Sequence, residues 1–444
     1  MGEQPHLLWQ INHQGAESLS GIDRQQFSVD TDEPLSDRQK PYQRAQKRGL
    51  PHPFFARNTG KLTVLRHEGQ PFCQRLSANG NRSIFYLNHR LCFCKSTKKN
   101  SIHHQFLCFF SYLCAKIMNF NNKQQSSRWR LPAEWEPQWG VQLTWPHAGT
   151  DWAPMLQEIT DTYEEMAREI RKREHLLIVG QPNNDTWARD HGFITLVDDE
   201  GHVRLLDFCF NGWGEKFPAE LDNAINRRLY DKGEVKGEYV DCLDFVLEGG
   251  SIESDGRGTV FTTSCCLLAP HRNQPMTKFE IEERLKRELH AERILWIDHG
   301  QLTGDDTDGH IDTLVRICPD DTLLYVGCDD PEDEQYEELR LMEEQLKTFR
   351  TLEGMPYKLV KLPMPRPIYD EGMRLPATYA NFLIINGAVL CPTYGQSDLD
   401  EEALHLIGNV FPGREIVGID CRSVIKQHGS LHCCTMQFPL EMKK

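Results

Sequence analysis

The residues of this chain best suited to chemistry are the nine from Gly304 to Asp312, which contain four aspartates, one histidine and two glycines. This composition makes a poor hydrophobic core. It is typical of a site that holds a cation beside a group that transfers protons. A second cluster, His432-Cys433, lies near the C-terminus. Histidine, carboxylate and cysteine are together the groups of a thiol enzyme that acts on a positively charged substrate.

Three further segments combine ionisable or nucleophilic groups with glycine: Trp187–Gly192, Leu247–Ser251 and Gly429–Cys434. Each lies where a predicted strand meets a loop, a position at which rigid elements present functional side chains. Each also has a plainer interpretation when taken alone. The first could be a structural ion pair beside a packed indole, Glu248 a polar group at a strand end, and Cys433 a small buried residue.

Several common sites are excluded, although a solvated acidic turn over residues 304–312 stays open. An EF-hand loop needs an acid at its first position and Glu at its twelfth, but Gly304 and Val315 occupy them. The chain after residue 128 has no Cys-x-x-Cys pair typical of structural zinc. Residues 249–253 lack the closing glycine of a serine-hydrolase elbow, and neither Gly-x-Gly-x-x-Gly nor a P-loop occurs.

Charge is distributed unevenly along the 444 residues, whose net charge is −15. Residues 1–128 carry 18 Lys and Arg against 8 Asp and Glu, whereas the rest carries 32 against 57 and is strongly acidic. An acidic body attracts cationic ligands and disfavours nucleic acid as a partner. We therefore expect a small cationic substrate and no nucleic-acid partner.

The fifteen cysteines show no repeated spacing, and two adjacent pairs occur, Cys265-Cys266 and Cys433-Cys434. Such cysteines are typical of reduced, buried residues in an intracellular protein. No signal peptide is recognisable. The most apolar window, Phe106–Met118, is shorter than the roughly 20 residues that span a bilayer. We therefore predict a cytoplasmic protein without a membrane partner.

Residues 1–128 lack a persistent hydrophobic period, which argues against a domain there. We interpret them as a disordered extension or a non-native leader, with Met118 as a possible true start. A small folded module is the alternative, and a mitochondrial targeting role is a minor one because four acidic residues interrupt the segment. Residues 129–444 form the predicted domain.

The domain region alternates predicted helices with more numerous strands, so its fold class is α/β. The helices span 153–173, 278–290, 331–349 and 400–409. The strands span 176–180, 193–196, 203–210, 244–247, 259–263, 293–297, 322–326, 357–362, 380–385, 388–392, 415–419 and 432–437. Turn residues 255–258 and Asn386-Gly387 indicate hairpins. Helices recur after every two or three strands, which is compatible with a repeated ββαβ unit.

Eight ordered motifs resemble those of the agmatine deiminase family, which includes the bacterial type of peptidylarginine deiminase. They are Leu131–Pro137, Trp145–His147, Trp187–Asp190, Phe210–Gly214, Glu248–Ser251, Gly304–Asp312, Leu375–Phe382 and His432–Cys433. The similarity covers about residues 131–439. It implies a pentein fold, an α/β propeller of five ββαβ-type units with pseudo-fivefold symmetry around the active site.

The resemblance also implies a role for each site residue. Asp190 and Asp312 would clamp a guanidinium, whose planar donors suit paired carboxylates. The Cys433 thiolate would attack its carbon, and His310 would protonate the leaving ammonia and then activate water. The expected catalytic residues are Cys433, His310 and Glu248, and the expected substrate-binding residues are Asp190, Asp312, Trp187 and Asp308.

Two geometric expectations accompany these roles. Glu248 is expected to orient His310 and favour its protonated form. His310 and Asp312 are expected to share one face of a strand, because residues i and i+2 of a strand point to the same side. The cationic substrate and His310 would favour the Cys433 thiolate. No metal or organic cofactor is expected.

The resemblance implies hydrolysis of agmatine to N-carbamoylputrescine and ammonia, in putrescine and polyamine biosynthesis. The alternatives are a peptidyl or free arginine deiminase, for which Arg366 and Arg374 are conceivable carboxylate partners, and a non-catalytic pentein binding protein. A homo-oligomer is expected. Two departures from the family pattern are Phe193, where proline is usual, and the loop Gln427–Ser430, where glycines are usual.

Overall fold

The computed structural model describes residues 63–66, 75–78, 82–87, 90–95 and 128–443. The chain divides into two units, residues 1–126 and 127–444. In the first, four strands form an antiparallel sheet in the order β1-β4-β3-β2. They are β1 (Thr63–Arg66), β2 (Arg75–Ala78), β3 (Arg82–Leu87) and β4 (Arg90–Lys95). The sequence analysis did not predict these short strands.

The other predictions for the N-terminal part, a disordered or non-native leader and a start at Met118, fall largely outside the described residues. They stay predictions, as does the domain boundary after residue 128. None of the helices in the described part of the chain is long and apolar enough to cross a bilayer.

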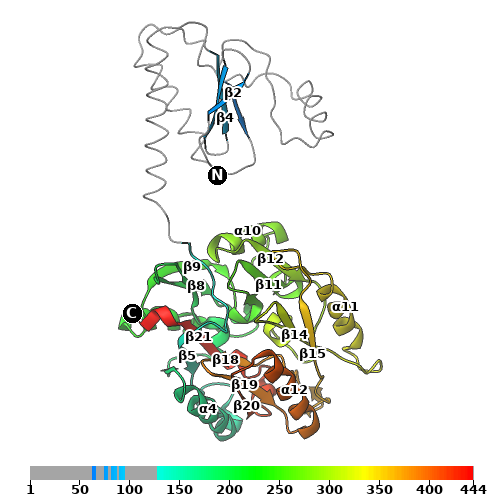
Figure 1. The fold of residues 1–444 in the computed structure, drawn as a ribbon. Helices are drawn as coiled ribbons and strands as arrows, with labels where there is room; N and C mark the ends of the chain where they lie inside the picture. The colour runs from blue at the N-terminus through cyan, green and yellow to red at the C-terminus, as the bar shows by residue number, and fades with distance from the viewer. Residues whose placement is uncertain (1–62, 67–74, 79–81, 88–89, 96–127, 444) are drawn as a thin grey trace. The chain divides into compact units, whose positions relative to one another are not determined.

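The second unit contains five three-stranded sheets that share one pattern and follow one another around a common centre (Figure 1). In each sheet the middle strand pairs antiparallel with the first and parallel with the third. The sheets are β21 (Thr435–Pro439), β5 (Gln138–Thr144), β6 (His175–Val179); β7 (Ile194–Val197), β8 (Val203–Cys209), β9 (Glu238–Val246); β10 (Ile252–Ser254), β11 (Thr259–Thr263), β12 (Arg293–Ile297); β13 (Val315–Cys318), β14 (Thr322–Val326), β15 (Lys358–Leu362); and β18 (Leu383–Ile385), β19 (Ala388–Thr393), β20 (Glu415–Asp420). The expected pentein fold of five ββαβ units is confirmed.

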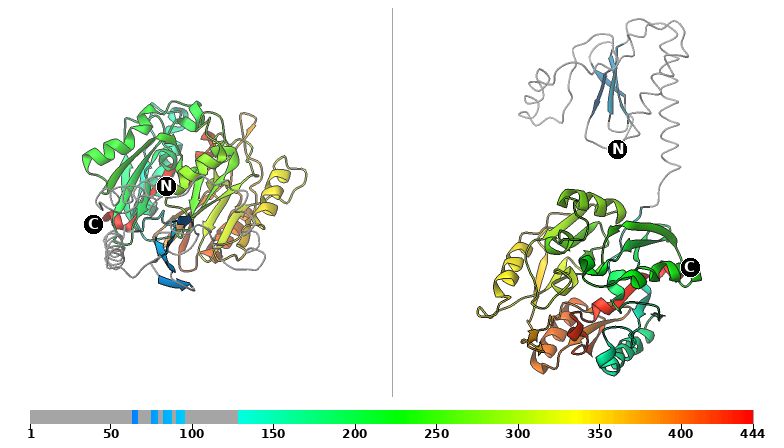
Figure 2. Two further views of the ribbon diagram at one scale, coloured as in Figure 1. Left: turned by 90° about the horizontal axis from the view of Figure 1, so that it is seen from above. Right: turned by 180° about the vertical axis from the view of Figure 1, so that it is seen from behind.

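At least one helix joins the middle and last strand of each sheet, as a parallel connection requires. The longest helix in each connection is α4 (Leu156–Arg171), α8 (Ile225–Lys232), α10 (Lys278–Glu288), α11 (Tyr336–Leu346) and α12 (Ser397–Val410), in chain order. The short helix η2 (Ala153–Met155) precedes α4. Helices α4, α10 and α11 lie at the outer rim in both views (Figures 1 and 2). The centre is thus left to strand ends and loops.

The ring closes through the C-terminus, because β21 supplies the first strand of the sheet that β5 and β6 complete (Figure 2). Thr435 of β21 lies opposite Leu143 of β5 in an antiparallel register. Residues near the two ends of the domain therefore share one sheet, which brings Cys433 next to segments that precede it by hundreds of residues.

Most predicted elements are confirmed within a few residues, and two local reasons explain the agreement. Thr277 and Glu280 form a reciprocal capping box that starts α10, as such residues do three positions apart. Gly387 has a φ of 74° in the hairpin between β18 and β19, a conformation that glycine adopts without strain. Strands β5, β10 and β13 and helix α8 were not predicted.

Two segments differ from the prediction at the site itself. Residues 432–434 form the short helix η6 before β21 rather than the start of that strand. His310 and Asp312 do not lie in a strand, since Ile311–Thr313 is the short helix η4 and His310 precedes it. The period-two expectation for these two side chains was therefore wrong, because η4 turns the chain just before β13 begins.

A buried cation links several units at the centre. The Arg316 side chain is fully buried and donates through Nε to Glu253, at 2.6 Å, and through Nη2 to Glu134, at 2.9 Å. Its Nη1 donates to the carbonyls of Ala380 and Phe382. Burial opposes the charge, but the two glutamates outweigh it and raise the pKa of Arg316.

Replacing Arg316 with Met should destabilise the domain by about 3–5 kcal/mol, because it leaves two buried glutamates without their cation. The midpoint of urea unfolding of the full chain measures the change. The control is Arg366→Met, which breaks an exposed ion pair with Asp398 and should leave the midpoint unchanged. Equal midpoints for the two variants would contradict a structural role for the Arg316 cluster.

Candidate active site

The predicted site residues occupy the same place in successive units, the short helical turn just before the first strand. Asp190 lies in α5 (Ala188–His191) before β7, and Glu248 precedes η3 (Gly249–Ser251) before β10. Asp312 lies in η4 before β13, and Cys433 in η6 before β21. Each turn points its side chains toward the centre of the ring, where the five units meet.

Asp190 is fixed by two donors from neighbouring elements. Its Oδ2 accepts a hydrogen bond from the Trp213 indole Nε1 at 2.9 Å, and its Oδ1 accepts one from the Gly250 backbone at 3.1 Å. Burial raises the pKa of the carboxyl to about 6. A carboxylate that is held in place and lacks a Lys or Arg partner among the described residues is ready to receive a cationic ligand.

Three site side chains converge on Gly250. A Cβ atom at this position would lie 2.6 Å from His310 Nδ1, 2.8 Å from Asp190 Oδ1 and 3.3 Å from Asp312 Oδ2. The imidazole and the carboxylates therefore meet as predicted, although not through a strand. Burial opposes the imidazolium charge, but the carboxylates of Asp190, Glu248 and Asp312 outweigh it and raise the pKa of His310.

The Cys433 thiol is 3.4 Å from Asn381 Oδ1 and 3.9 Å from Asp312 Oδ2. Burial, together with the negative charges of Asp312 and Asp190, raises its pKa well above the ordinary value of a thiol. Without a cation in the site the sulfur therefore holds its proton. The expectation that the cationic substrate and His310 favour the thiolate stays a prediction for the substrate-bound site, and the neighbouring carboxylates oppose the thiolate in the empty site.

His432, next to the nucleophile, bridges two carboxylates. Its Nδ1 lies 2.7 Å from Asp312 Oδ2 and its Nε2 lies 2.7 Å from Glu134 Oε2. Burial opposes the negative charge on Asp312, but His432 outweighs it and lowers the pKa of that carboxyl. The second oxygen, Oδ1, is buried without a partner among the described residues.

Glu248 and Asp308 are engaged differently from the expectation. Glu248 Oε1 accepts from Arg272 Nε at 2.8 Å, and no described hydrogen bond joins Glu248 to His310. Asp308 accepts from Arg272 Nη1 at 2.7 Å and pairs with Lys216 at 2.9 Å. Glu248 acts on His310 through its charge. The substrate-binding role of Asp308 stays a prediction, and its ion pairs with Arg272 and Lys216 compete with that role.

A cavity of about 340 Å³ opens in front of Asp190 and Cys433. His310, Asp312 and Glu248 are not among its lining residues. Four carboxylic acids line it, and neither Lys nor Arg does so. Its lining comprises Asp151, Asp185, Trp187, Asp190, Trp213, Phe217, Asp306, Thr307, Gln427, His428, Gly429 and Cys433. The space is therefore built for a ligand with positive charge.

The loop that departs from the family pattern forms one side of this cavity. His428 lies 2.7 Å from the Gly304 carbonyl through Nδ1, which joins the loop to the segment before His310. A Cβ atom at Gly429 would lie 2.2 Å from the Trp187 ring, so this position requires glycine. The altered loop thus keeps the one glycine that its packing needs.

Several residues that shape the site carried no role in the sequence analysis. Glu134, Trp213, Asn381 and His432 lie in the ordered motifs, so the motif positions alone marked them. Arg272 lies in none of the motifs and precedes α10 by a few residues. A single arginine that is far in sequence from its carboxylate partners forms no recognisable sequence motif. Its part in the site is seen only in its tertiary contacts with Glu248 and Asp308.

A buried cysteine, an imidazole and paired carboxylates on a pentein fold define a guanidine-modifying enzyme. The comparisons agree. A family model described as Porphyromonas-type peptidyl-arginine deiminase matches residues 130–439. The chain belongs to this family, which also takes in the agmatine deiminases, and it is a hydrolase that removes an imino group from a guanidino compound.

Three similar proteins carry different substrate names. A Vibrio parahaemolyticus protein named "Putative agmatine deiminase" is 35% identical over 353 residues, covering 70% of this chain and 96% of that one. The structure of a Porphyromonas gingivalis "Putative Arginine Deiminase" is 48% identical, with a TM-score of 0.67, covering 70% and 99%. A cysteine-to-serine variant of the C. jejuni agmatine deiminase with substrate bound is 37% identical, with a TM-score of 0.66, covering 71% and 97%.

The ionisation of the Asp190 carboxyl is expected to set the acid limb of the pH profile of kcat/KM. Its pKa of about 6 means that the free enzyme loses the charged clamp below that pH. We expect kcat/KM, which reports the free enzyme, to fall about tenfold per pH unit there. Steady-state rates at subsaturating substrate measure this, and reassay at neutral pH controls for unfolding. A profile that stays flat well below pH 6 would contradict the assignment.

Proposed function

We propose that the protein is an agmatine deiminase, which hydrolyses the guanidinium of agmatine to a ureido group and releases ammonia. The observation that supports this most is the charge of the cavity lining, in which Asp151, Asp185, Asp190 and Asp306 face the space without a Lys or Arg. Agmatine carries a positive charge at both ends, and a cavity lined by four aspartates matches such a ligand.

The contacts support one role for each residue. The guanidinium enters between Asp190 and the free Oδ1 of Asp312, and its charge offsets the carboxylates that keep the Cys433 thiol protonated. The thiol then releases its proton to solvent, and the thiolate attacks the guanidinium carbon to form the C–S bond. The His310 imidazolium gives its proton to the departing ammonia. The neutral imidazole next takes a proton from water, which displaces the sulfur from carbon and yields the product.

The far end of the substrate is assigned to Asp306. Asp185 already accepts hydrogen bonds from the Trp152 indole, at 2.9 Å, and from the Thr186 backbone, at 2.7 Å. Asp306 makes no ion pair in the described part of the chain, and it lines the cavity on the segment whose Gly304 carbonyl lies 2.7 Å from His428 Nδ1. Its carboxylate is therefore the better partner for a primary ammonium.

A second candidate is a deiminase of free or peptidyl arginine, which the 48% identity to a relative named for arginine favours. Its substrate presents a carboxylate or a peptide group at the far end. The two arginines considered for that end do not line the cavity, because Arg374 pairs with Asp333 at 2.8 Å and Arg366 pairs with Asp398. His428 is the one basic side chain in the described lining.

Asp306→Asn should raise KM for agmatine by about tenfold or more, since a hydrogen bond to a charged group is worth about 1.5–3 kcal/mol. Ammonia release from agmatine, free arginine and an arginine peptide is measured side by side with product identification. Butylguanidine, which lacks the amine, is the matched control and should turn over equally in both enzymes. Turnover of arginine or the peptide but not agmatine would overturn the proposal.

Cys433→Ser should abolish turnover while the variant still binds agmatine, because the cavity and its carboxylates remain. Isothermal titration measures binding, and ammonia release measures turnover. Cys434→Ser is the control, since the neighbouring thiol donates to the Ser430 carbonyl and lies away from the cavity lining. Residual activity in Cys433→Ser that disappears in the double variant would assign the nucleophile to Cys434 instead.

A further inference from the structure

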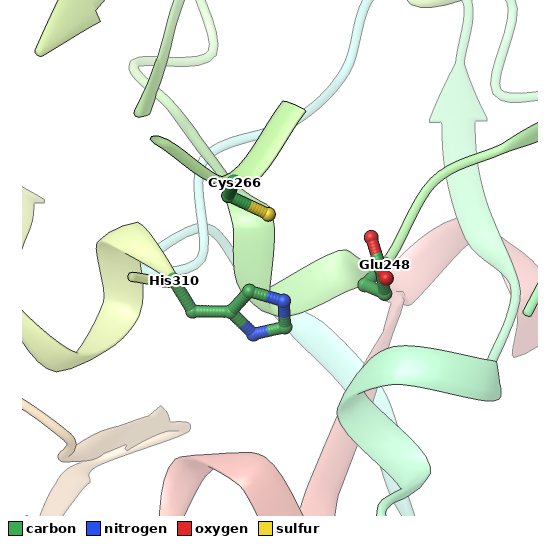
Figure 3. Close-up of side chains that lie close together, drawn as sticks. All are labelled: Glu248, Cys266 and His310. Carbon is green, nitrogen blue, oxygen red and sulfur yellow. The ribbon is translucent and has the colours of Figure 1, made fainter. Parts of the chain in front are cut away.

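A third buried side chain lies close to Glu248 and His310. It is Cys266 in the short helix α9 (Ser264–Leu267). One potential ligand atom from each of the three residues lies within 4.8 Å of the others. Figure 3 shows the imidazole next to the thiol and the carboxylate, with one ring nitrogen directed toward them. Because Nδ1 faces Asp190 at 3.6 Å, this nitrogen is Nε2.

The three groups are buried, and they have unused binding capacity. Glu248 Oε1 is taken by Arg272, but Oε2 has no hydrogen-bond partner among the described residues, and neither ring nitrogen of His310 has one. All three residues have a relative exposure of 0%. A buried polar atom without a partner costs about 1–3 kcal/mol, so a ligand that supplies partners to all three is favoured.

The other buried group of this kind, Glu134, Glu253 and His432, serves as a contrast. Arg316 already binds both of its glutamates, and both nitrogens of His432 contact carboxylates. A cation is thus already present there as a side chain. Around Cys266 the internal cation, Arg272, binds only Oε1 of Glu248. Oε2 of Glu248 and the ring nitrogens of His310 have no hydrogen-bond partner among the described residues, which makes this group the candidate for an external cation.

We propose that Glu248, Cys266 and His310 form an inhibitory Zn²⁺ site. Thiolate, imidazole and carboxylate are the side chains that bind zinc, and a site with three protein ligands keeps one position for water. Magnesium and calcium prefer all-oxygen shells and do not suit a thiolate. The thiolate and the carboxylate balance the two charges of the ion, while Asp308 balances Arg272.

Zinc bound here stops the reaction through His310. The imidazole coordinates through the lone pair of Nε2 and so can no longer cycle between its two protonation states, which the leaving ammonia and the attacking water both require. The nucleophile and the cavity stay untouched. The site was invisible in the sequence because Cys266 and His310 come from different units of the ring, so no short ligand spacing marks it.

The plainer explanation is that Cys266 only packs. It belongs to a hydrophobic cluster with Leu267 and Leu285, and a thiol serves well there. That explanation gives zinc no effect that depends on Cys266. The two interpretations therefore differ in a property that can be measured without any substrate.

Cobalt binding to the full chain tests the site directly. In a Cys433→Ser background, which removes the nucleophile as a competing ligand, Co²⁺ should bind at one equivalent with a near-ultraviolet thiolate charge-transfer absorption that zinc displaces. Adding Cys266→Ala should abolish that absorption and weaken the metal by more than the roughly 10–100-fold that an outer-shell partner contributes. Adding Cys265→Ala instead, which removes the adjacent exposed thiol, should change nothing.

Activity gives the second readout. With Cys433 intact, zinc should inhibit the wild type and Cys265→Ala, and a chelator should restore both. In the presence of a chelator, Cys266→Ala should keep its basal activity, which also shows that the variant folds. The zinc concentration that inhibits it by half should rise by the same factor as its metal affinity falls. Absence of cobalt absorption in the Cys433→Ser protein, or equal zinc inhibition of Cys266→Ala and wild type, overturns the proposal. The cobalt result stands whichever guanidino compound proves to be the substrate.

Discussion

The burial of one arginine constrains the centre of this enzyme. Arg316 lies where four units of the ring meet, and its donors are used by Glu134, Glu253 and the carbonyls of Ala380 and Phe382. A charge in the interior is tolerated only when every partner is in place. The units therefore have little freedom to shift against one another. Glu134 in turn contacts His432, and His432 contacts Asp312. The buried contacts of Arg316 are therefore continuous with Asp312, the residue proposed to bind the substrate.

Repetition explains how a large fold makes a small site. Each unit begins its first strand after a short turn, and these turns face the centre. Four of them supply Asp190, Glu248, Asp312 and Cys433, while the fifth supplies Asn381, whose amide oxygen contacts the thiol. Equivalent positions in the ring thus carry different chemistry. The C-terminal strand β21 must join β5 before Cys433 reaches its partners, so the site forms only when the ring is closed.

The electrostatics of the site couple reactivity to ligand charge. Buried carboxylates raise the pKa of the Cys433 thiol and of the His310 imidazole together. These shifts favour a protonated thiol and a protonated imidazole in the absence of a ligand. In the proposed mechanism, a cationic ligand offsets the carboxylates next to the thiol and favours the thiolate. The same negative charges would attract the metal cation proposed for Glu248, Cys266 and His310.

The sequence by itself determined the parts that depend on short range: the alternation of strands and helices, the hairpin at Asn386-Gly387, the capped start of α10, and the motifs that contain Cys433, His310, Asp190, Asp312 and Glu248. The elements follow from periodicity, turn chemistry and capping, and the motifs were identified by their resemblance to a known family. Only the tertiary structure decided that the turn at η4, rather than a strand, positions His310 and Asp312. It also decided that Glu248 accepts a hydrogen bond from Arg272 and none from His310. Finally, it placed Cys266 beside Glu248 and His310. Those contacts join segments tens to hundreds of residues apart. No local pattern encodes them, because their energy comes from desolvating charges that meet only when the ring closes.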